Sequence, residues 1–454
     1  MVEVLQIETP SLGDRSYLVH DGTVALVVDP QRDIDRVLAL AAEHGVRVTH
    51  IAETHIHNDY LTGGLALARA TGAEYLVNEA DPVRFPRTPL RDGDSIAVSD
   101  AIGVRVLATP GHTFTHLSYA LETDGAVTGV FTGGSLLYGA TGRPDLLGPE
   151  NTGALARAQY ASAHRLAREL PEATEVFPTH GFGSFCSAGP VGGRASTIGH
   201  EKLVNPALTL RQEVYLDTLL AGLDAWPAYY AHMGPANLAG PDGPDLSPPR
   251  RADAAEVCRR IDGGEWVIDL RDRVAFAAGF LPGSVSFALC DSFASYVGWA
   301  VPWGAPVTLL GDTPDQVAEA QRELARIGFD RTAAAAAGRP ADWAGDRPLS
   351  SLRLAKFGDL ADRLARGPAG PVILDVRRRL EWEQRHIAGA THIPFTDLPG
   401  RLDDVPPGET WVYCQSGYRA AVAASLLAAH GREVVSVNDD FSNAPAASLA
   451  LDSA

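Results

Sequence analysis

Cysteines and long apolar runs are scarce in this chain of 454 residues. Its four cysteines, Cys186, Cys258, Cys290 and Cys414, are widely spaced. This spacing argues against a disulfide scaffold and favours a cytoplasmic location. No uninterrupted apolar run approaches the roughly 18 residues that a membrane span requires. The N-terminus also lacks the basic and apolar regions of a secretion signal, so we expect no association with membranes.

Basic residues are outnumbered by acidic ones. There are 38 Lys and Arg against 56 Asp and Glu, which gives a formal net charge of −18. Because phosphate backbones attract basic surfaces, this balance disfavours nucleic acid as a partner. Hydrophobic residues make up 45% of the chain, as in ordinary globular proteins. At roughly 150 residues per domain, the length predicts about three domains.

Two segments with linker-like composition divide the chain. Residues 235–251 are rich in Pro, Gly and Asp and show no apolar period. Residues 331–351 contain an alanine run, which could instead extend a helix, followed by a stretch with Gly and Pro. The predicted domains are therefore residues 1–240, 252–335 and 352–450.

The last two domains contain an internal repeat. The motifs DLR at 269–271 and DVR at 375–377 each end an apolar, strand-like run. At the same offset of 106 residues, LPGS at 281–284 matches IAGA at 387–390. We interpret them as two copies of one α/β unit. The copy at 252–335 has no cysteine after its strand PVTLL, so we predict that it is inactive and retained for packing or spacing.

The first domain alternates strand-like and helical segments. The apolar periods predict strands at 24–28, 46–54, 104–108 and 126–132, and helices at 34–43 and 61–70. In α/β folds the loops that follow strands carry the chemistry, so functional residues are expected there.

Four histidines follow predicted strands: His55 and His57 in THIHNDY, His112 in TPGHT, and His180 in PTH. A turn after a strand can aim alternate side chains at one point, so the His-x-His pair supplies two imidazoles to a metal ion. Imidazole is the commonest metal-binding side chain. Together with Asp59, these residues predict a metal site.

These segments resemble a known family. THIHND at 54–59, TPGHT at 109–113 and PTH at 178–180 resemble the signatures of the metallo-β-lactamase fold. FTG at 131–133 and GRPD at 142–145 resemble its persulfide dioxygenase branch. The resemblance implies an α/β (α+β) fold, a four-layer αββα sandwich with the site at one edge of two packed sheets. It also implies one iron, held by His55 and His112, since Tyr60 replaces the last histidine of the signature.

Gly134 departs from this pattern, because it stands where persulfide dioxygenases have a metal-binding aspartate. Two histidines and one carboxylate leave open positions for substrate and oxygen, and glycine supplies no ligand. Four outcomes stay open. His57 completes the set and favours zinc, Asp59 or Asp145 supplies the oxygen, the metal rests on two histidines and water, or the site is empty. We expect a weakened site for one Fe(II) per chain, with zinc as the alternative, and expect Gly134→Asp to raise iron occupancy.

Further residues of this domain have more than one interpretation. His180 is an additional candidate ligand. Arg143 and Asp145 either line a substrate channel or form an ordinary ion pair in a turn. Cys186 either touches a thiol substrate or is a small buried hydrophobe. Asp29 either orients a ligand histidine through its second nitrogen or closes a turn.

Cys414 ends the apolar run at 411–413 and begins a loop before a strongly helical segment at 420–429. The backbone N–H groups of such a loop and the positive end of the helix stabilise a thiolate or a persulfide. Arg419 adds positive charge and closes the loop. This arrangement suits sulfur or phosphoryl transfer through a covalent cysteine.

The same region resembles the rhodanese family, through CQSGYRA at 414–420 and the pattern DVR…E…HIAGA at 375–390. The resemblance implies that Cys414 carries the sulfane sulfur, and the residues that cradle it are Gln415, Ser416, Gly417, Tyr418 and Arg419. Asp375 and Glu381 are expected to have structural roles or to support the loop. The spacing of five positions from cysteine to arginine favours sulfur over the larger phosphate.

The order of domains resembles persulfide dioxygenase–rhodanese fusions. This implies that the first domain oxidises a low-molecular-weight thiol persulfide to sulfite with Fe(II) and oxygen. The rhodanese then transfers sulfane sulfur between a persulfide and sulfite or thiosulfate. Two alternatives stay open: a sulfurtransferase with a non-catalytic first domain, and a zinc-dependent thioester hydrolase. The expected partners are small molecules, and a homo-oligomer is also open.

Overall fold

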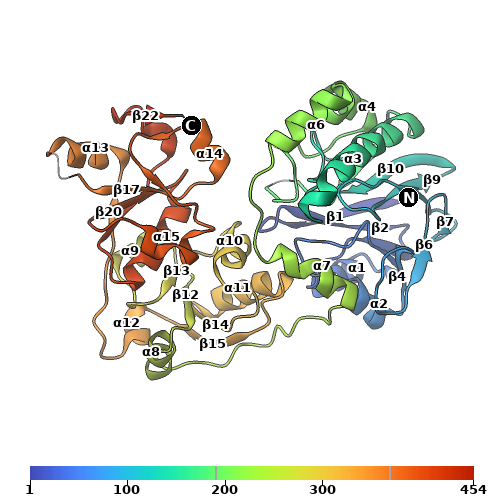
Figure 1. Ribbon diagram of the computed structural model, residues 1–454. Coiled ribbons are helices and arrows are strands. Elements are labelled where there is room, and N and C mark those ends of the chain that lie inside the picture. Colours follow the sequence, from blue (N-terminus) through green and yellow to red (C-terminus); the bar gives the residue numbers. More distant parts are fainter. Residues whose placement is uncertain (182, 190–191, 368–369, 454) are drawn as a thin grey trace. The chain divides into compact units, whose positions relative to one another are not determined.

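The computed structural model (Figure 1) describes residues 1–181, 183–189, 192–367 and 370–453. It divides into two compact units, which are Met1–Asp245 with Ala325–Gly328, and Leu246–Leu324 with Phe329–Ala454. Both expected α/β repeats thus fall in the second unit. Among the described residues, no helix combines the length and the apolar character needed to cross a membrane.

Two β-sheets form the middle of the first unit. In spatial order, the six-stranded sheet consists of β1 (Glu3–Thr9), β2 (Asp14–His20), β3 (Val24–Val28), β4 (Arg47–Ala52), β5 (Glu74–Asn78) and β6 (Thr88–Leu90). The five-stranded sheet consists of β11 (Glu175–Pro178), β10 (Ala126–Gly133), β9 (Leu117–Thr123), β8 (Gly103–Ala108) and β7 (Ser95–Ala97).

Most helices of this unit lie on the outer faces of the sheets, whereas the last one packs against the loop of residues 57–62. The helices of the unit are α1 (Asp35–Glu43), α2 (Gly64–Thr71), α3 (Pro149–Glu169), α4 (Ile198–Val204), α5 (Pro206–Thr209), α6 (Gln212–Ala221) and α7 (Tyr230–Ala239). Alternation along β2 shows how the layers form. Tyr17 and Val19 pack between the two sheets, whereas Leu18 packs under α1 and α2. A third apolar cluster joins the second sheet to α3. The αββα sandwich expected from the sequence is confirmed.

The first linker begins later than the sequence indicates. Residues 230–239 form α7, with Pro235 inside the helix. Proline disfavours helix interiors, but Met233 and Asn237 of this helix are buried. Tertiary packing therefore overrides the local preference, and the extended segment starts after Gly240.

The second unit contains two parallel sheets. The first has the order β13 (Val285–Ser286), β12 (Trp266–Asp269), β14 (Val307–Gly311) and β15 (Thr332–Ala337). The second has the order β16 (Arg353–Ala355), β21 (Val434–Val437), β20 (Thr410–Tyr413), β17 (Val372–Asp375) and β19 (Thr391–His392), and the short strands β18 (His386–Ile387) and β22 (Leu451–Asp452) pair separately. The helices are α8 (Ala254–Asp262), α9 (Arg273–Ala278), α10 (Phe293–Ala300), α11 (Pro314–Arg326), α12 (Pro340–Ala344), α13 (Phe357–Ala365), α14 (Arg379–Gln384) and α15 (Tyr418–Ala429).

The two sheets show the same repeat that the sequence shows. Ile268 pairs with Val285 in the first copy, and Leu374 pairs with Thr391 in the second, both at the offset of 106 residues. Asp269 and Arg271 form a buried ion pair of 2.6 Å, and the DVR motif of the second copy forms its counterpart. Leu310 pairs with Asp269 in the first copy, and Tyr413 pairs with Asp375 in the second. The residue that follows is Gly311 in the first copy and Cys414 in the second.

The second predicted linker is wrong over most of its length. The alanine run forms β15, which pairs in parallel with β14, and α12 follows at 340–344. Alanine favours helices locally. Here Ala334 and Ala336 pack instead in the cluster around Trp343, so sheet pairing decides the conformation. The first repeat therefore extends beyond residue 335.

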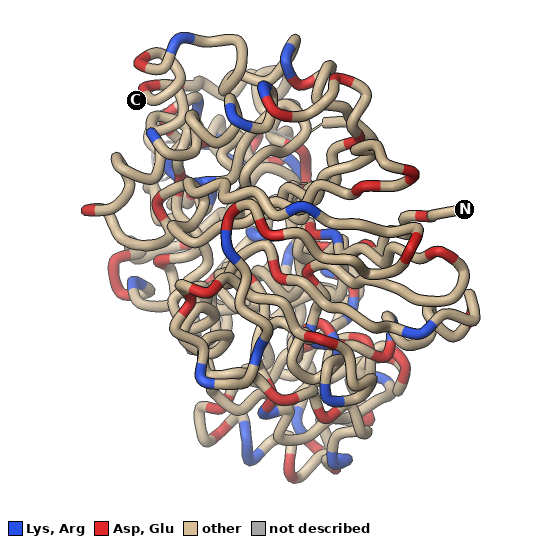
Figure 2. Tube along the Cα trace, turned by 90° about the vertical axis from the view of Figure 1, so that its right-hand side faces the viewer, with Lys and Arg blue, Asp and Glu red and all other residues tan. Residues whose placement is uncertain are grey.

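Figure 2 shows acidic residues (red) and basic residues (blue) interspersed along the trace of the chain. This mixture accompanies the net charge of −18.

Candidate functional site

Loops after three strands bring three histidines together at one end of the sandwich. His55 follows β4, His112 follows β8 and His180 follows β11, and all three are buried. One ring nitrogen of each lies within 4.8 Å of the others. The Nε2 atoms of His55 and His180 are 3.2 Å apart. The ends of strands from both sheets thus converge on one point, as the sequence predicts for His55 and His112.

Each of these rings is oriented through its other nitrogen. The Nδ1 partners are Thr54 Oγ1 at 2.9 Å for His55, the Arg143 carbonyl at 2.8 Å for His112, and Asp14 Oδ1 at 3.0 Å for His180. Because the His112 Nδ1 donates to a carbonyl, its Nε2 carries the free lone pair. Within the described residues this buried Nε2 has no hydrogen-bond partner. Outer bonds of this kind fix the tautomer that a metal ion needs.

The protonation of the cluster also suits a metal ion. Burial and the charge of His180 lower the pKa of His112 to about 3, and burial holds the pKa of His55 well below its ordinary value. Burial opposes charge on His180 as well, but Asp59 and Asp14 outweigh it and raise its pKa to about 10. A protonated His180 donates from its Nε2 to the Nε2 of His55, which lies 3.2 Å away. A cation would replace that proton.

Asp59 lies beside the three-histidine group. Its carboxylate is 3.2 Å from His180 Nδ1, and it belongs to a second potential ligand group with His57 and His180. Both of its oxygens are buried and lack hydrogen-bond partners within the described residues. Converging imidazole nitrogens with an adjacent carboxylate fit a first-row transition metal. Of the four outcomes left open by the sequence, the empty site is thus the least supported by the donor set.

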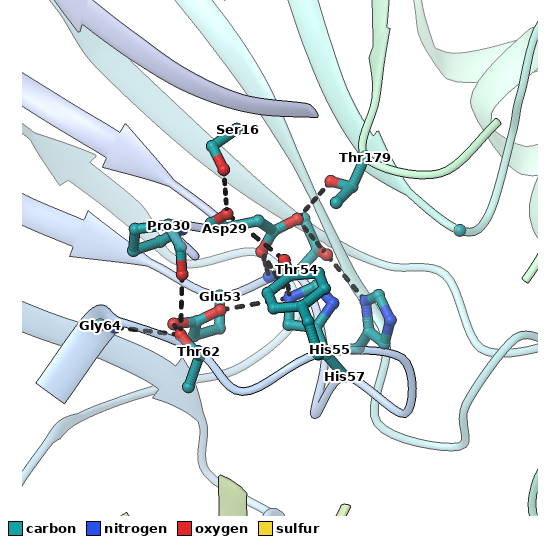
Figure 3. Close-up of polar contacts among 12 residues, drawn as sticks. Ser16, Asp29, Pro30, Glu53, Thr54, His55, His57, Thr62, Gly64 and Thr179 are labelled. Atoms are coloured by element: carbon teal, nitrogen blue, oxygen red, sulfur yellow. Dashed lines mark hydrogen bonds and ion pairs between the residues drawn. The ribbon is translucent and has the colours of Figure 1, made fainter. Parts of the chain in front are cut away.

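His57 points toward a different set of residues (Figure 3). Its Nε2 lies 3.3 Å from carboxylate oxygens of Asp29 and Glu53 and 3.0 Å from the Tyr60 hydroxyl. Although burial alone would lower it, the two carboxylates raise the pKa of His57 to about 9. His180, not His57, therefore completes the group with His55 and His112. The two acids hold the ring of His57 in this structure, and the alternative in which His57 serves as a metal ligand stays a prediction.

Asp29 connects this network to the cluster. It accepts hydrogen bonds from the Thr54 amide and from the Thr54 hydroxyl, both at 2.7 Å, and from the Thr179 hydroxyl (Figure 3). Thr54 in turn holds the ring of His55. Asp29 therefore orients His57 directly and His55 through Thr54.

Gly134 leaves room for His112 rather than for a ligand. A Cβ at this position would lie 2.4 Å from Cδ2 and 2.6 Å from Cγ of the His112 ring. Real Cβ contacts are longer than 3.0 Å. The imidazole thus occupies the space that an aspartate side chain would need.

Arg143 is buried and its side chain is fully engaged. It forms two bonds of 2.7 Å to Asp145 and donates to the carbonyls of Phe185 and Asp224. Since the Arg143 carbonyl holds His112, this geometry supports a positioning role for the Arg143–Asp145 pair. The assignment of both residues to a substrate channel stays a prediction. Both carboxylate oxygens of Asp145 bind Arg143, and the alternative in which Asp145 supplies the missing oxygen ligand also stays a prediction.

Cys186 is fully buried. Burial, together with the charges of Asp59 and Asp14, keeps the pKa of its thiol well above the ordinary value. The side chain therefore lies near the cluster as a neutral thiol.

Asn237 is a functional residue that the sequence did not reveal. Its amide donates to the carbonyls of His57 and Tyr60, both at 2.9 Å, and its oxygen accepts from the Thr62 amide. It thereby fixes the loop that carries the histidine signature. It lies in the segment assigned to a linker, and no local pattern marks it.

The second centre is the loop that follows β20. Cys414 is 2% exposed, and its Sγ accepts a hydrogen bond of 3.1 Å from the Gly417 amide. Gly417 has φ 96° and caps the N-terminus of α15. Its left-handed conformation favours glycine, and a Cβ there would lie 2.7 Å from Asn438 Oδ1. The sulfur therefore faces an amide at the positive end of a helix, as the sequence predicts.

Arg419 is held beneath this loop. Glu381 accepts bonds of 2.6 and 2.8 Å from its two terminal nitrogens. Burial alone would raise the pKa of Glu381, but the ion pair outweighs it and lowers the pKa to about 2. Arg419 thus contributes a fixed, buried cation close to Cys414, and Glu381 has the loop-supporting role expected of it.

The first repeat packs directly against this loop. The Tyr418 hydroxyl donates to the Ala288 carbonyl at 2.9 Å, and the ring of Tyr296 lies 5.2 Å from Tyr418 and 5.3 Å from Phe395. The copy without a cysteine therefore contributes part of the wall of the second centre. A pocket of about 310 Å³ opens beside the loop, with Gln415 and Arg385 in its lining.

Comparisons with known proteins match the two centres separately. Residues 14–180 match the model of the metallo-beta-lactamase superfamily, and residues 357–444 match that of the rhodanese-like domain. The chain is 32% identical over 186 residues to the hydroxyacylglutathione hydrolase of Maricaulis maris. This alignment covers 40% of this chain and 67% of the relative. The chain is 28% identical over 207 residues to the mitochondrial persulfide dioxygenase ETHE1 of Homo sapiens. This second alignment covers 45% of this chain and 72% of the relative.

A solved metallo-beta-lactamase from Staphylococcus aureus is similar over more of the chain. It has a TM-score of 0.66 and 28% identity, and the alignment covers 74% of this chain and 98% of that one. Three further hydroxyacylglutathione hydrolases are matched over 54%, 57% and 48% of their length. The chain thus spans about half the length of these curated relatives.

Proposed function

Since this chain belongs to the metallo-β-lactamase superfamily and also carries a rhodanese-like domain, we propose that it is a sulfur-metabolism enzyme with two centres. In this proposal the first centre oxidises a low-molecular-weight thiol persulfide with the aid of a metal ion. The second transfers sulfane sulfur through Cys414.

One observation carries the sulfur-transfer assignment. The Cys414 sulfur accepts the Gly417 amide at the N-terminus of α15, next to the cation of Arg419. Both features stabilise an anion on that sulfur. The Cys414 thiolate attacks the sulfane sulfur of a persulfide RS–SH. The RS–S bond breaks, the thiol RSH leaves, and Cys414 holds the sulfur as a persulfide.

The second half of the transfer returns the cysteine to its starting state. Sulfite attacks the outer sulfur of the Cys414 persulfide, the S–S bond to Cys414 breaks, and thiosulfate leaves with the Cys414 thiolate restored. Thiosulfate as donor runs these steps in reverse. Arg385, which lines the pocket beside the loop, is exposed and offers positive charge to such anions.

The first centre would convert a persulfide, oxygen and water to a thiol and sulfite: RSSH + O₂ + H₂O gives RSH + H₂SO₃. His55, His112 and His180 would hold the metal ion, with Asp59 alongside. When bound, the ion supplies coordination positions for a sulfur anion and oxygen. The residues of this chain aim the imidazoles through Thr54, Arg143 and Asp14. We propose iron, which the resemblance to persulfide dioxygenases implies, and the persulfide dioxygenase ETHE1 is among the relatives.

A second candidate is thioester hydrolysis at the first centre. Several relatives are named hydroxyacylglutathione hydrolases. Three imidazoles without an aspartate at position 134 are also a set that suits zinc. In this case the centre would contain zinc and turn over without oxygen.

Metal analysis and an oxygen electrode separate these candidates in the purified full chain. We expect iron and oxygen uptake on a thiol persulfide, and thiosulfate formation from persulfide and sulfite. Cys414→Ser should abolish thiosulfate formation and leave oxygen uptake largely intact, whereas Cys258→Ser, the matched control, should change neither. Loss of both activities in Cys414→Ser would contradict this division of labour. Zinc with thioester turnover and no oxygen uptake would establish the second candidate.

A further inference from the structure

A second group of potential metal ligands lies in the first unit. Glu3 belongs to β1, His20 ends β2, and His44 follows the last residue of α1. One ligand atom of each lies within 4.8 Å of the others. The antiparallel register of β1 and β2 sets Glu3 directly opposite His20.

This group is separate from the three-histidine cluster. His20 pairs with Ala25 near the start of β3, whereas Asp29 of the histidine network follows the end of β3. Four residues of strand at about 3.3 Å each separate the two positions by roughly 13 Å. The two groups therefore lie toward opposite ends of the strands of the six-stranded sheet.

The three side chains share the helix-covered face of the sheet. Leu18, two residues before His20, packs under α1 and α2, and Leu5, two residues after Glu3, packs in the same cluster. The period of two along a strand puts Glu3 and His20 on this face as well. The rings of His20 and His44 confirm it, since their centroids are 5.0 Å apart.

His20 is buried without adequate partners. It is 6% exposed, and neither ring nitrogen has a hydrogen-bond partner in the described part of the chain. The nearest carboxylate oxygen, Oε2 of Glu3, is 3.6 Å from its Nε2, which is too long for a hydrogen bond. A buried polar atom left unpaired costs free energy. A ligand that binds this imidazole would remove that cost.

We propose that Glu3, His20 and His44 form a second metal site, specific for a borderline divalent cation of the zinc class. Two imidazoles and one carboxylate are ligands that zinc accepts in a four-coordinate site, with water in the fourth position. The net charge of −18 favours cations near the chain. Because the ligands come from β1, β2 and the end of α1, the bound ion joins the first strand to the body of the sandwich. The proposal does not depend on the reaction at either centre.

The test compares zinc binding by the full chain and by three single variants. His44→Gln and Glu3→Gln each remove one ligand at a position that is not fully buried. His200→Gln is the control, since His200 is an exposed histidine of the same unit outside every potential ligand group of the described residues. After chelation, the chain is titrated with Zn²⁺ against a competing chromophoric chelator, and thermal unfolding is recorded with and without zinc.

We expect the unaltered chain and His200→Gln to bind one more zinc ion than His44→Gln. In Glu3→Gln that ion should bind at least about tenfold more weakly. Removing a residue that only supports a metal ligand already costs about tenfold in affinity, and Glu3 is a direct ligand in this proposal. Zinc should raise the unfolding temperature less in both ligand variants than in the control. Equal zinc stoichiometry in the unaltered chain and His44→Gln would overturn the proposal. So would a site that fills only at millimolar zinc.

Discussion

Replacing Gly134 with aspartate tests how this chain holds a metal ion. Motif reasoning alone expects Gly134→Asp to restore a ligand and raise iron occupancy. The structure leads to the opposite expectation, because the new Cβ would lie 2.4 Å from the ring of His112. That ring is buried and fixed by its hydrogen bond to the Arg143 carbonyl. It therefore cannot move aside without losing its orientation.

The size of the effect follows from the cost of overpacking a buried site. Such insertions cost about 1–3 kcal/mol. At about 1.4 kcal/mol per factor of ten, a displaced His112 would lower metal affinity by roughly five- to a hundredfold. Gly134→Ala is the matched control, since it adds the same Cβ without a carboxylate. Both variants should lose metal to a similar extent.

The assay is metal content by mass spectrometry after dialysis against a graded series of chelator concentrations. Thermal unfolding of the metal-free chains measures the packing cost separately. If Gly134→Asp retained more metal than the unaltered chain while Gly134→Ala retained less, the carboxylate would be acting as a ligand. That result would refute the steric reasoning and the assignment of His180 as the third ligand.

Two further predictions concern partners of the site residues. Asp14→Asn removes the carboxylate behind His180 and should weaken metal binding by about 10- to 100-fold in the same assay, whereas no change would show that His180 is not a ligand. Glu381→Gln leaves Arg419 buried without its anion and should destabilise the chain by about 3 kcal/mol in urea unfolding. Because the pKa of Glu381 is lowered from 4.5 to about 2, this stabilisation is present above pH 4.5 and is lost as pH falls toward 2. The difference between the unaltered chain and Glu381→Gln should therefore shrink over that interval, and a difference independent of pH would contradict the ion-pair explanation.

Local patterns in the sequence were sufficient to predict the structure wherever it depends on residues that are neighbours in the chain. The loop from Cys414 to Arg419 is such a case, because a strand, a glycine and a helix in direct succession determine its shape. The internal repeat is another, since its offset of 106 residues reappears in the strand register. The apolar period also predicted β3, β8 and β10 to within a residue or two.

Positions whose neighbours are distant in the chain were decided by the tertiary structure. The alanine run became strand β15 because β14 was available to pair with it, and α7 formed around Pro235 because its Asn237 binds the loop of His57.

The metal site combines both kinds of information. The sequence by itself supplied the histidines, since an imidazole is a ligand wherever it is placed. Only the folded chain decided their roles. Asp29 and Glu53 hold His57, while Asp14, 166 residues before His180, aims that ring at His55. A side chain's direction depends on hydrogen bonds to groups that folding brings near, and no local pattern records those groups.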